Sequence, residues 1–171
     1  MKRITIALLL CLLLVGCNFG IVYVDPPVRY EKGGLVIEGD PYVELGLYEE
    51  QLYVAFEDGD AAPVVHGLQG GTWTHPALRT TGIGTPAVVD CSLITDDGEQ
   101  VGFAQAVTNF FVGVDGFLEV QSYPLPILHT APGKGPEIDD LYGVGATLSC
   151  AVTDLDGRGS QARVALFLEQ G

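Results

Sequence analysis

Alternation of apolar and polar or small residues is the feature that most constrains the fold of this chain. In residues 42–48, 148–152 and 164–168 a branched aliphatic residue or a cysteine stands at every second position, and no segment of residues 42–171 sustains the spacing of a helix. A period of two is typical of β-strands. Four Asp-Gly dipeptides, which end at Gly59, Gly98, Gly116 and Gly157, punctuate these strands where tight hairpins require positive φ. The pattern predicts an all-β chain of antiparallel strands.

The first sixteen residues have the parts of a secretory signal, namely the cations Lys2 and Arg3, an apolar run from Ile4 to Val15, and the small residue Gly16. The apolar run is shorter than the roughly 20 residues that a membrane-spanning helix needs. Leu14-Val15-Gly16-Cys17 resembles the lipobox of bacterial lipoproteins. The resemblance implies that residues 1–16 are cleaved and that Cys17 carries the acyl chains, and Asn18, where lipoproteins of the inner membrane carry Asp, favours the outer membrane. The alternative is an ordinary secretory cut beside a chance cysteine.

Two cysteines remain in the mature chain once Cys11 is removed with the signal and Cys17 is lipidated. An even pair in an oxidising compartment predicts a disulfide between Cys91 and Cys150. Residues 91–98 align without gaps on residues 150–157, so both cysteines occupy the same phase of similar hairpins. Hairpins on opposing sheets would turn both thiols inward, which predicts a disulfide-braced antiparallel β-sandwich of immunoglobulin-like architecture. Trp73 precedes both cysteines, whereas a true immunoglobulin domain has its tryptophan between them.

Charge and composition divide the chain and exclude one class of partner. The signal takes two of the eight basic residues, so six basic residues face 22 acidic ones in the mature chain, a formal net charge of −16. Phosphate binding needs Lys and Arg in larger numbers, so nucleic acid is not an expected partner. Residues 17–40 mix prolines, glycines and charges and are interpreted as a lipid-anchored tether. Residues 41–171 are the predicted β-sandwich domain.

The most distinctive motif of the domain is the turn Gly67-Leu-Gln69-Gly-Gly71, which precedes an aromatic and His-containing strand. With residues 43–46 and 57–60 it resembles uncharacterised exported domains of Gram-negative bacteria, a resemblance that implies no activity. One interpretation is a shaped loop that leads into a strand over residues 72–80. The other is a ligand-binding cleft in which Gln69 joins Trp73, His75 and Arg79, whose side chains would alternate along one face of that strand.

Motifs for metal binding and catalysis are sparse in this sequence. His66 and His75 are weak candidates for metal ligands, together with an acidic residue such as Asp60, but no His-x-His or His-Glu-x-x-His spacing occurs. A calcium loop that begins at Asp154 would place Arg158 at a ligand position, so a hairpin turn is the better interpretation. No Gly-x-Ser-x-Gly motif is present. Neither a cofactor nor an enzymatic activity is expected, although a hydrolase stays a third hypothesis.

The leading hypothesis is a non-enzymatic lipoprotein of the cell envelope whose β-sandwich contacts another protein or a surface. Its membrane contact is the lipid on Cys17, and its expected location is the outer membrane. The alternative hypothesis is a module that binds a small ligand or a metal around His66, Trp73 and His75.

Overall fold

The computed structural model describes residues 28–31, 34–67, 71–127 and 138–171, in which strands account for nearly all regular structure. The helix within these ranges is the short α2 (Ile138–Leu141). No helix of the described ranges is long and apolar enough to span a membrane. The predicted signal peptide, Cys17 and Gln69 lie outside the described residues.

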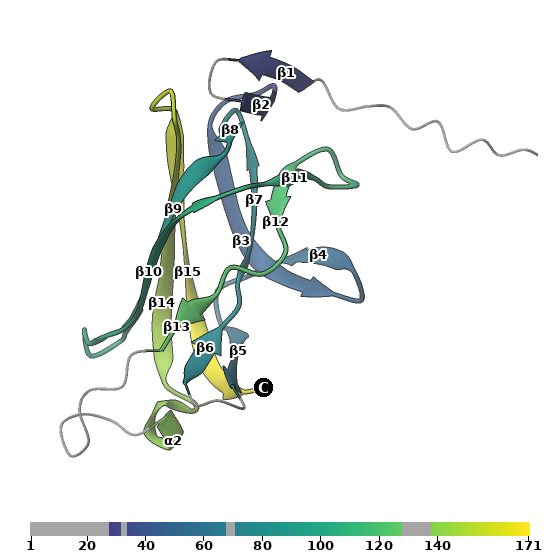
Figure 1. The fold of residues 1–171 in the computed structure, drawn as a ribbon. Coiled ribbons are helices and arrows are strands. Elements are labelled where there is room, and N and C mark those ends of the chain that lie inside the picture. The colour runs from purple at the N-terminus through teal and green to yellow at the C-terminus, as the bar shows by residue number, and fades with distance from the viewer. Residues whose placement is uncertain (1–27, 32–33, 68–70, 128–137) are drawn as a thin grey trace, which may run out of the picture.

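The strands form two facing sheets and one small sheet (Figure 1). The seven-stranded sheet has the order β10 (Gln100–Thr108), β9 (Ala87–Thr95), β14 (Gly145–Asp154), β15 (Gly159–Gln170), β5 (Asp60–His66), β6 (Thr72–Thr74), β13 (Leu125–Pro126). The five-stranded sheet has the order β11 (Phe111–Val112), β12 (Leu118–Val120), β7 (Ala77–Thr81), β3 (Tyr42–Glu49), β4 (Leu52–Ala55). The small sheet contains β1 (Val28–Glu31), β2 (Gly34–Ile37) and β8 (Gly84–Thr85). Neighbouring strands are antiparallel, except that β15 and β5 are parallel.

One hydrophobic core lies between the two large sheets. Every second side chain of β9 and β14 is buried, and these strands face the buried side chains of β3, β7 and β12. Val89, Leu93 and Leu148 come from the seven-stranded sheet, and Leu78 and Leu118 come from the other. The structure therefore confirms the predicted all-β, antiparallel sandwich of immunoglobulin-like architecture, since alternating residues can bury one face of each sheet.

The Asp-Gly dipeptides lie in turns, as the sequence predicts. Gly98, Gly116 and Gly157 have φ of 89°, 78° and 83° and close the hairpins β9–β10, β11–β12 and β14–β15. This left-handed conformation favours glycine, which has no Cβ. Gly59, with φ of 94°, lies instead between β4 and β5, so that turn carries the chain from one large sheet to the other.

Cys91 and Cys150 form the predicted disulfide, but its place in the fold differs from the prediction. The two residues lie directly opposite each other on the neighbouring strands β9 and β14, with a Cα–Cα distance of 4.1 Å. The two similar hairpins lie side by side in one sheet, so the prediction that they occupy opposing sheets is wrong. Because the hairpins share one phase, β9 and β14 can pair antiparallel with both cysteines on the buried face. The disulfide braces one sheet instead of joining two.

The packed body begins before residue 41, where the sequence places its boundary. Val36 and Ile37 of β2 are buried, and Ile37 belongs to the main core. Backbone pairing joins β2 to β8, and Gly34 lies so close to the carbonyl of Thr85 that a Cβ has no room there. Residues 34–37 therefore pair and pack with the folded body of the protein.

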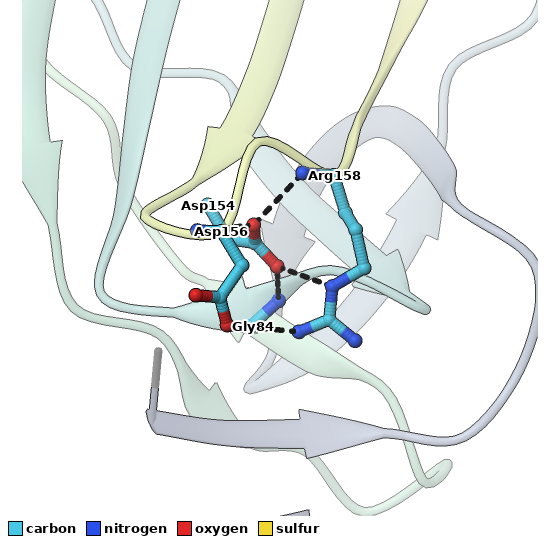
Figure 2. A network of polar contacts seen from close by, with 4 residues as sticks. All are labelled: Gly84, Asp154, Asp156 and Arg158. Atoms are coloured by element: carbon cyan, nitrogen blue, oxygen red, sulfur yellow. Dashed lines mark hydrogen bonds and ion pairs between the residues drawn. The ribbon is translucent and has the colours of Figure 1, made fainter. Parts of the chain in front are cut away.

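The buried carboxylate of Asp154 fixes the β14–β15 turn to β8 (Figure 2). Its Oδ1 accepts hydrogen bonds from the backbone N–H groups of Asp156 and Arg158 at 3.0 and 2.9 Å. Its Oδ2 accepts from the Gly84 N–H at 2.8 Å and from Arg158 Nε at 2.9 Å. Burial by itself raises the pKa of this carboxyl, but the hydrogen bonds and the Arg158 charge outweigh burial and lower the pKa.

Candidate functional site

The predicted strand over residues 72–80 is interrupted, and this separates the residues of the predicted cleft. It consists of β6 in the seven-stranded sheet and β7 in the five-stranded sheet, with His75 and Pro76 between them. Pro76 has no N–H to continue a ladder, and its carbonyl accepts a hydrogen bond from Tyr123 N at 2.8 Å. Trp73 and Arg79 therefore belong to different sheets, so the prediction that they share one face of one strand is wrong.

Trp73 contributes to packing at the end of the seven-stranded sheet. Its cross-strand neighbours are Val65 of β5 and Pro126 of β13, and its side chain is half-buried. A Cβ on Gly71 would collide with the indole ring, so the glycine at this position lets the backbone of residue 71 approach Trp73 closely.

The two described histidines have separate partners. His66 Nε2 lies 2.7 Å from the Tyr142 hydroxyl, and its Nδ1 lies 3.2 Å from Thr72 Oγ1. His75 Nδ1 lies 3.1 Å from Ser122 Oγ. Asp60 and His66 stand at opposite ends of β5. No group of three His, Cys, Asp or Glu side chains that could hold a metal occurs among the described residues.

Arg79 is the centre of a polar cluster on the outer face of the five-stranded sheet. Its Nε lies 2.5 Å from Glu44 Oε2, and its Nη1 lies 3.8 Å from Asp115 Oδ2. The guanidinium carbon is 4.4 Å from the ring centre of Tyr53 and 4.3 Å from that of Phe117. Aromatic rings attract a cation over their faces. The guanidinium of Arg79 is thus engaged in contacts with side chains of the same chain.

Glu119 belongs to the same cluster and is covered by its neighbours. It is 1% exposed, lies opposite Arg79 in the β12–β7 register, and accepts a hydrogen bond from the Tyr48 hydroxyl. Burial and the bond to Glu119 raise the pKa of Tyr48 to about 12. Burial and the Glu44 charge also raise the pKa of Tyr53. The Tyr48 hydroxyl thus donates to a buried carboxylate, whereas the buried Tyr53 hydroxyl has no hydrogen-bond partner among the described residues.

A different feature, the side of the sandwich formed by residues 103–114, presents open backbone and apolar side chains together. We call these residues the β10–β11 edge. β10 and β11 follow each other along this side of the molecule, and each is the last strand of its sheet (Figure 1). Within the described ranges β10 pairs with β9 on one side, and on the other side pairing is limited to the bridge between Gly102 and Ile127.

Exposed apolar side chains are concentrated on the β10–β11 edge. Phe103 and Val107 point outward from β10, and Phe111, Val112 and Val114 follow on β11 and beyond it. The edge contains no charged residue between Glu99 and Asp115. Soluble proteins usually protect an open edge with lysine, proline or a covering segment. The described part of the edge has none of these.

The β10–β11 edge is held in position by buried contacts. Phe110, between the two strands, is buried, and its N–H donates to Thr85 Oγ1 at 2.7 Å. The Tyr123 hydroxyl donates to the Val89 carbonyl at 3.0 Å, behind β10. These contacts anchor Phe110 and the neighbouring strand β9 in the body of the domain.

The comparisons with known proteins assign no family to the chain. No protein-family model matches it, and no curated protein matches it. Among solved structures it is similar to the periplasmic chaperone SfaE, with 10% sequence identity and a TM-score of 0.35, over 75% of this chain and 57% of that one. Nothing about the function of this chain follows from a similarity that low.

Proposed function

We propose that this chain is a non-enzymatic lipoprotein of the bacterial cell envelope that binds another protein through the β10–β11 edge. The observation that carries the proposal is the coincidence, over residues 103–114, of two sheet edges that no other described strand pairs with and five exposed apolar side chains. Contiguous exposed apolar surface rimmed by polar residues marks an interaction site. Exposed backbone groups add hydrogen-bonding capacity to the same place.

Two features of the chain support its place in the envelope. The sequence Leu14-Val15-Gly16-Cys17 after a charged and apolar lead is suited to lipidation of Cys17, and several acyl chains hold a protein firmly to a membrane. The Cys91–Cys150 disulfide fits an oxidising compartment. The outer membrane is the location that Asn18 favours within this proposal.

The polar cluster around Arg79 is suited to a structural role. Its cation is held between two rings and two carboxylates, and its tyrosines are protonated at neutral pH. These contacts stabilise the outer face of the five-stranded sheet, next to the β11–β12 hairpin.

Photo-crosslinking in the bacteria that make this protein tests the proposal. A photoreactive benzoylphenylalanine replaces Val107, which is 66% exposed, or Leu155, which is 62% exposed in the β14–β15 turn and serves as the control. We expect irradiation to give a discrete covalent product with another envelope protein from position 107 and none from position 155. A Phe103→Lys substitution in the same chain should abolish that product. Equal products from both positions, or none from position 107, would contradict the proposal.

A further inference from the structure

We infer that the open part of β10, residues 103–108, binds an extended segment of a different protein as an added β-strand. The inference rests on the proposed function and specifies the kind of partner that the edge accepts. Strand addition satisfies the backbone groups of an open edge and reads the partner through alternate side chains.

The backbone of β10 sets the length of the segment. The bridge from Gly102 to Ile127 covers the start of the strand, and residues 103–108 continue beyond it with β9 on one side. Six residues span about 20 Å. In an antiparallel pair, successive residues direct their N–H and C=O groups to alternate sides, so about three of the six residues present both groups outward. A segment of about six residues satisfies them.

The side chains of β10 determine which side chains the bound segment should carry. On the inner face, the residues paired with Cys91 and Val89 are the small Ala104 and Ala106, and Ala106 is exposed although Val89 is fully buried. Larger apolar side chains of the added strand would fill the space beside these alanines and cover the margin of the core. On the outer face of β10, the exposed side chains of Phe103 and Val107 offer apolar contacts to the added strand. The segment should therefore carry apolar residues on both faces.

The negative charge of the chain favours a different protein over a second copy of this chain as the partner. The edge is neutral, but the acidic residues Glu99 and Asp115 border it, and the whole chain carries a formal net charge of −14. Two copies would repel each other as they approach. A segment with Lys or Arg near its ends meets the acidic borders favourably.

Selection from a random 12-residue peptide library displayed on phage tests the inference with the full chain purified in detergent. We expect enriched peptides to combine a run of about six apolar residues, which places apolar side chains on both faces of the added strand, with at least one terminal Lys or Arg. Their affinity, measured by fluorescence anisotropy, should fall at least tenfold for Val107→Lys and stay within twofold for Leu155→Lys. Both substitutions add the same charge at similarly exposed positions, so a general effect of charge would move both.

The outcomes separate this inference from the proposed function. Peptides that bind Val107→Lys as tightly as the parent chain, or a library from which none is enriched, would overturn strand addition while leaving the crosslink from position 107 as the test of protein binding. A parent chain that sediments as a dimer and becomes a monomer on Val107→Lys would show that the edge binds a second copy of this chain and not a different protein. Absence of a crosslink from position 107 would contradict the proposed function itself.

Discussion

Removal of the Cys91–Cys150 disulfide should destabilise the fold by an amount that the structure allows us to estimate. The bond closes a loop of 59 residues, and the loop entropy that it removes from the unfolded chain is worth about 4 kcal/mol. Both cysteines are buried in the core, so replacing each by alanine adds about 1 kcal/mol for lost packing. The double variant Cys91→Ala/Cys150→Ala should therefore lose about 4–6 kcal/mol, a large part of the 5–15 kcal/mol that holds a typical domain folded.

Urea unfolding followed by near-ultraviolet circular dichroism measures this loss. We expect the midpoint to fall steeply and the slope to rise, because an unfolded chain without the crosslink exposes more surface. The matched control is Ser92→Ala/Ser149→Ala, the next register pair on the same two strands, whose one described side-chain hydrogen bond joins Arg163 to Ser149. The control should lose about 1 kcal/mol or less. A disulfide variant that loses no more than the control would refute the reasoning.

Three further predictions follow from the anchor and the polar contacts. Cys17→Ala should move the protein from the membrane fraction to the soluble envelope fraction or leave an uncut precursor, and a processed protein that still sediments with membranes contradicts the anchor. Asp154→Asn should lose about 1–3 kcal/mol at pH 7, since asparagine cannot reproduce the four bonds to the carboxylate. Because the folded pKa of Asp154 is lowered, its contribution is present above the unfolded pKa of about 3.9 and is lost as the pH falls through the folded value. The difference between parent and variant in urea unfolding should therefore shrink at low pH, and a constant difference contradicts it. Arg79→Met should lower stability by about 1–3 kcal/mol, and Arg79→Lys should recover less than half of that in thermal unfolding, because lysine cannot stack between Tyr53 and Phe117. Full recovery by lysine would show that charge alone matters.

The architecture follows from local patterns that the sequence shows directly. Alternation along β3, β14 and β15 predicts strands, the Asp-Gly turns at Gly98, Gly116 and Gly157 predict hairpins, and the structure contains both. The pairing of hairpins with each other is a different kind of information. Two similar hairpins fit equally well in one sheet or in two facing sheets, since either arrangement buries both cysteines. The phase of Cys91 and Cys150 therefore predicts their bond but not the sheet that they share.

The prediction of a ligand-binding cleft is wrong because of one residue. Alternation alone makes residues 72–80 a single strand, whereas Pro76 allows the chain to leave one sheet and enter the other, which sends Trp73 and Arg79 apart. The β10–β11 edge cannot be predicted from the sequence for a related reason. Its residues 103–114 lack charge, but so do residues 61–78, which include buried strand positions. An edge is defined by the missing neighbour, and long-range pairing decides which strand lacks one.

Amide hydrogen exchange along β10 tests most directly the claim that this edge receives a strand. The exchange of residues 103–108 is measured by mass spectrometry in the full chain, with and without the tightest peptide from the library or the protein captured from position 107. We predict that exchange slows over residues 103–108 in the bound state, while the β14–β15 turn, which contains Leu155, exchanges at an unchanged rate. Slowing that is confined to another strand, or a bound state in which residues 103–108 exchange as fast as in the free chain, would contradict the account.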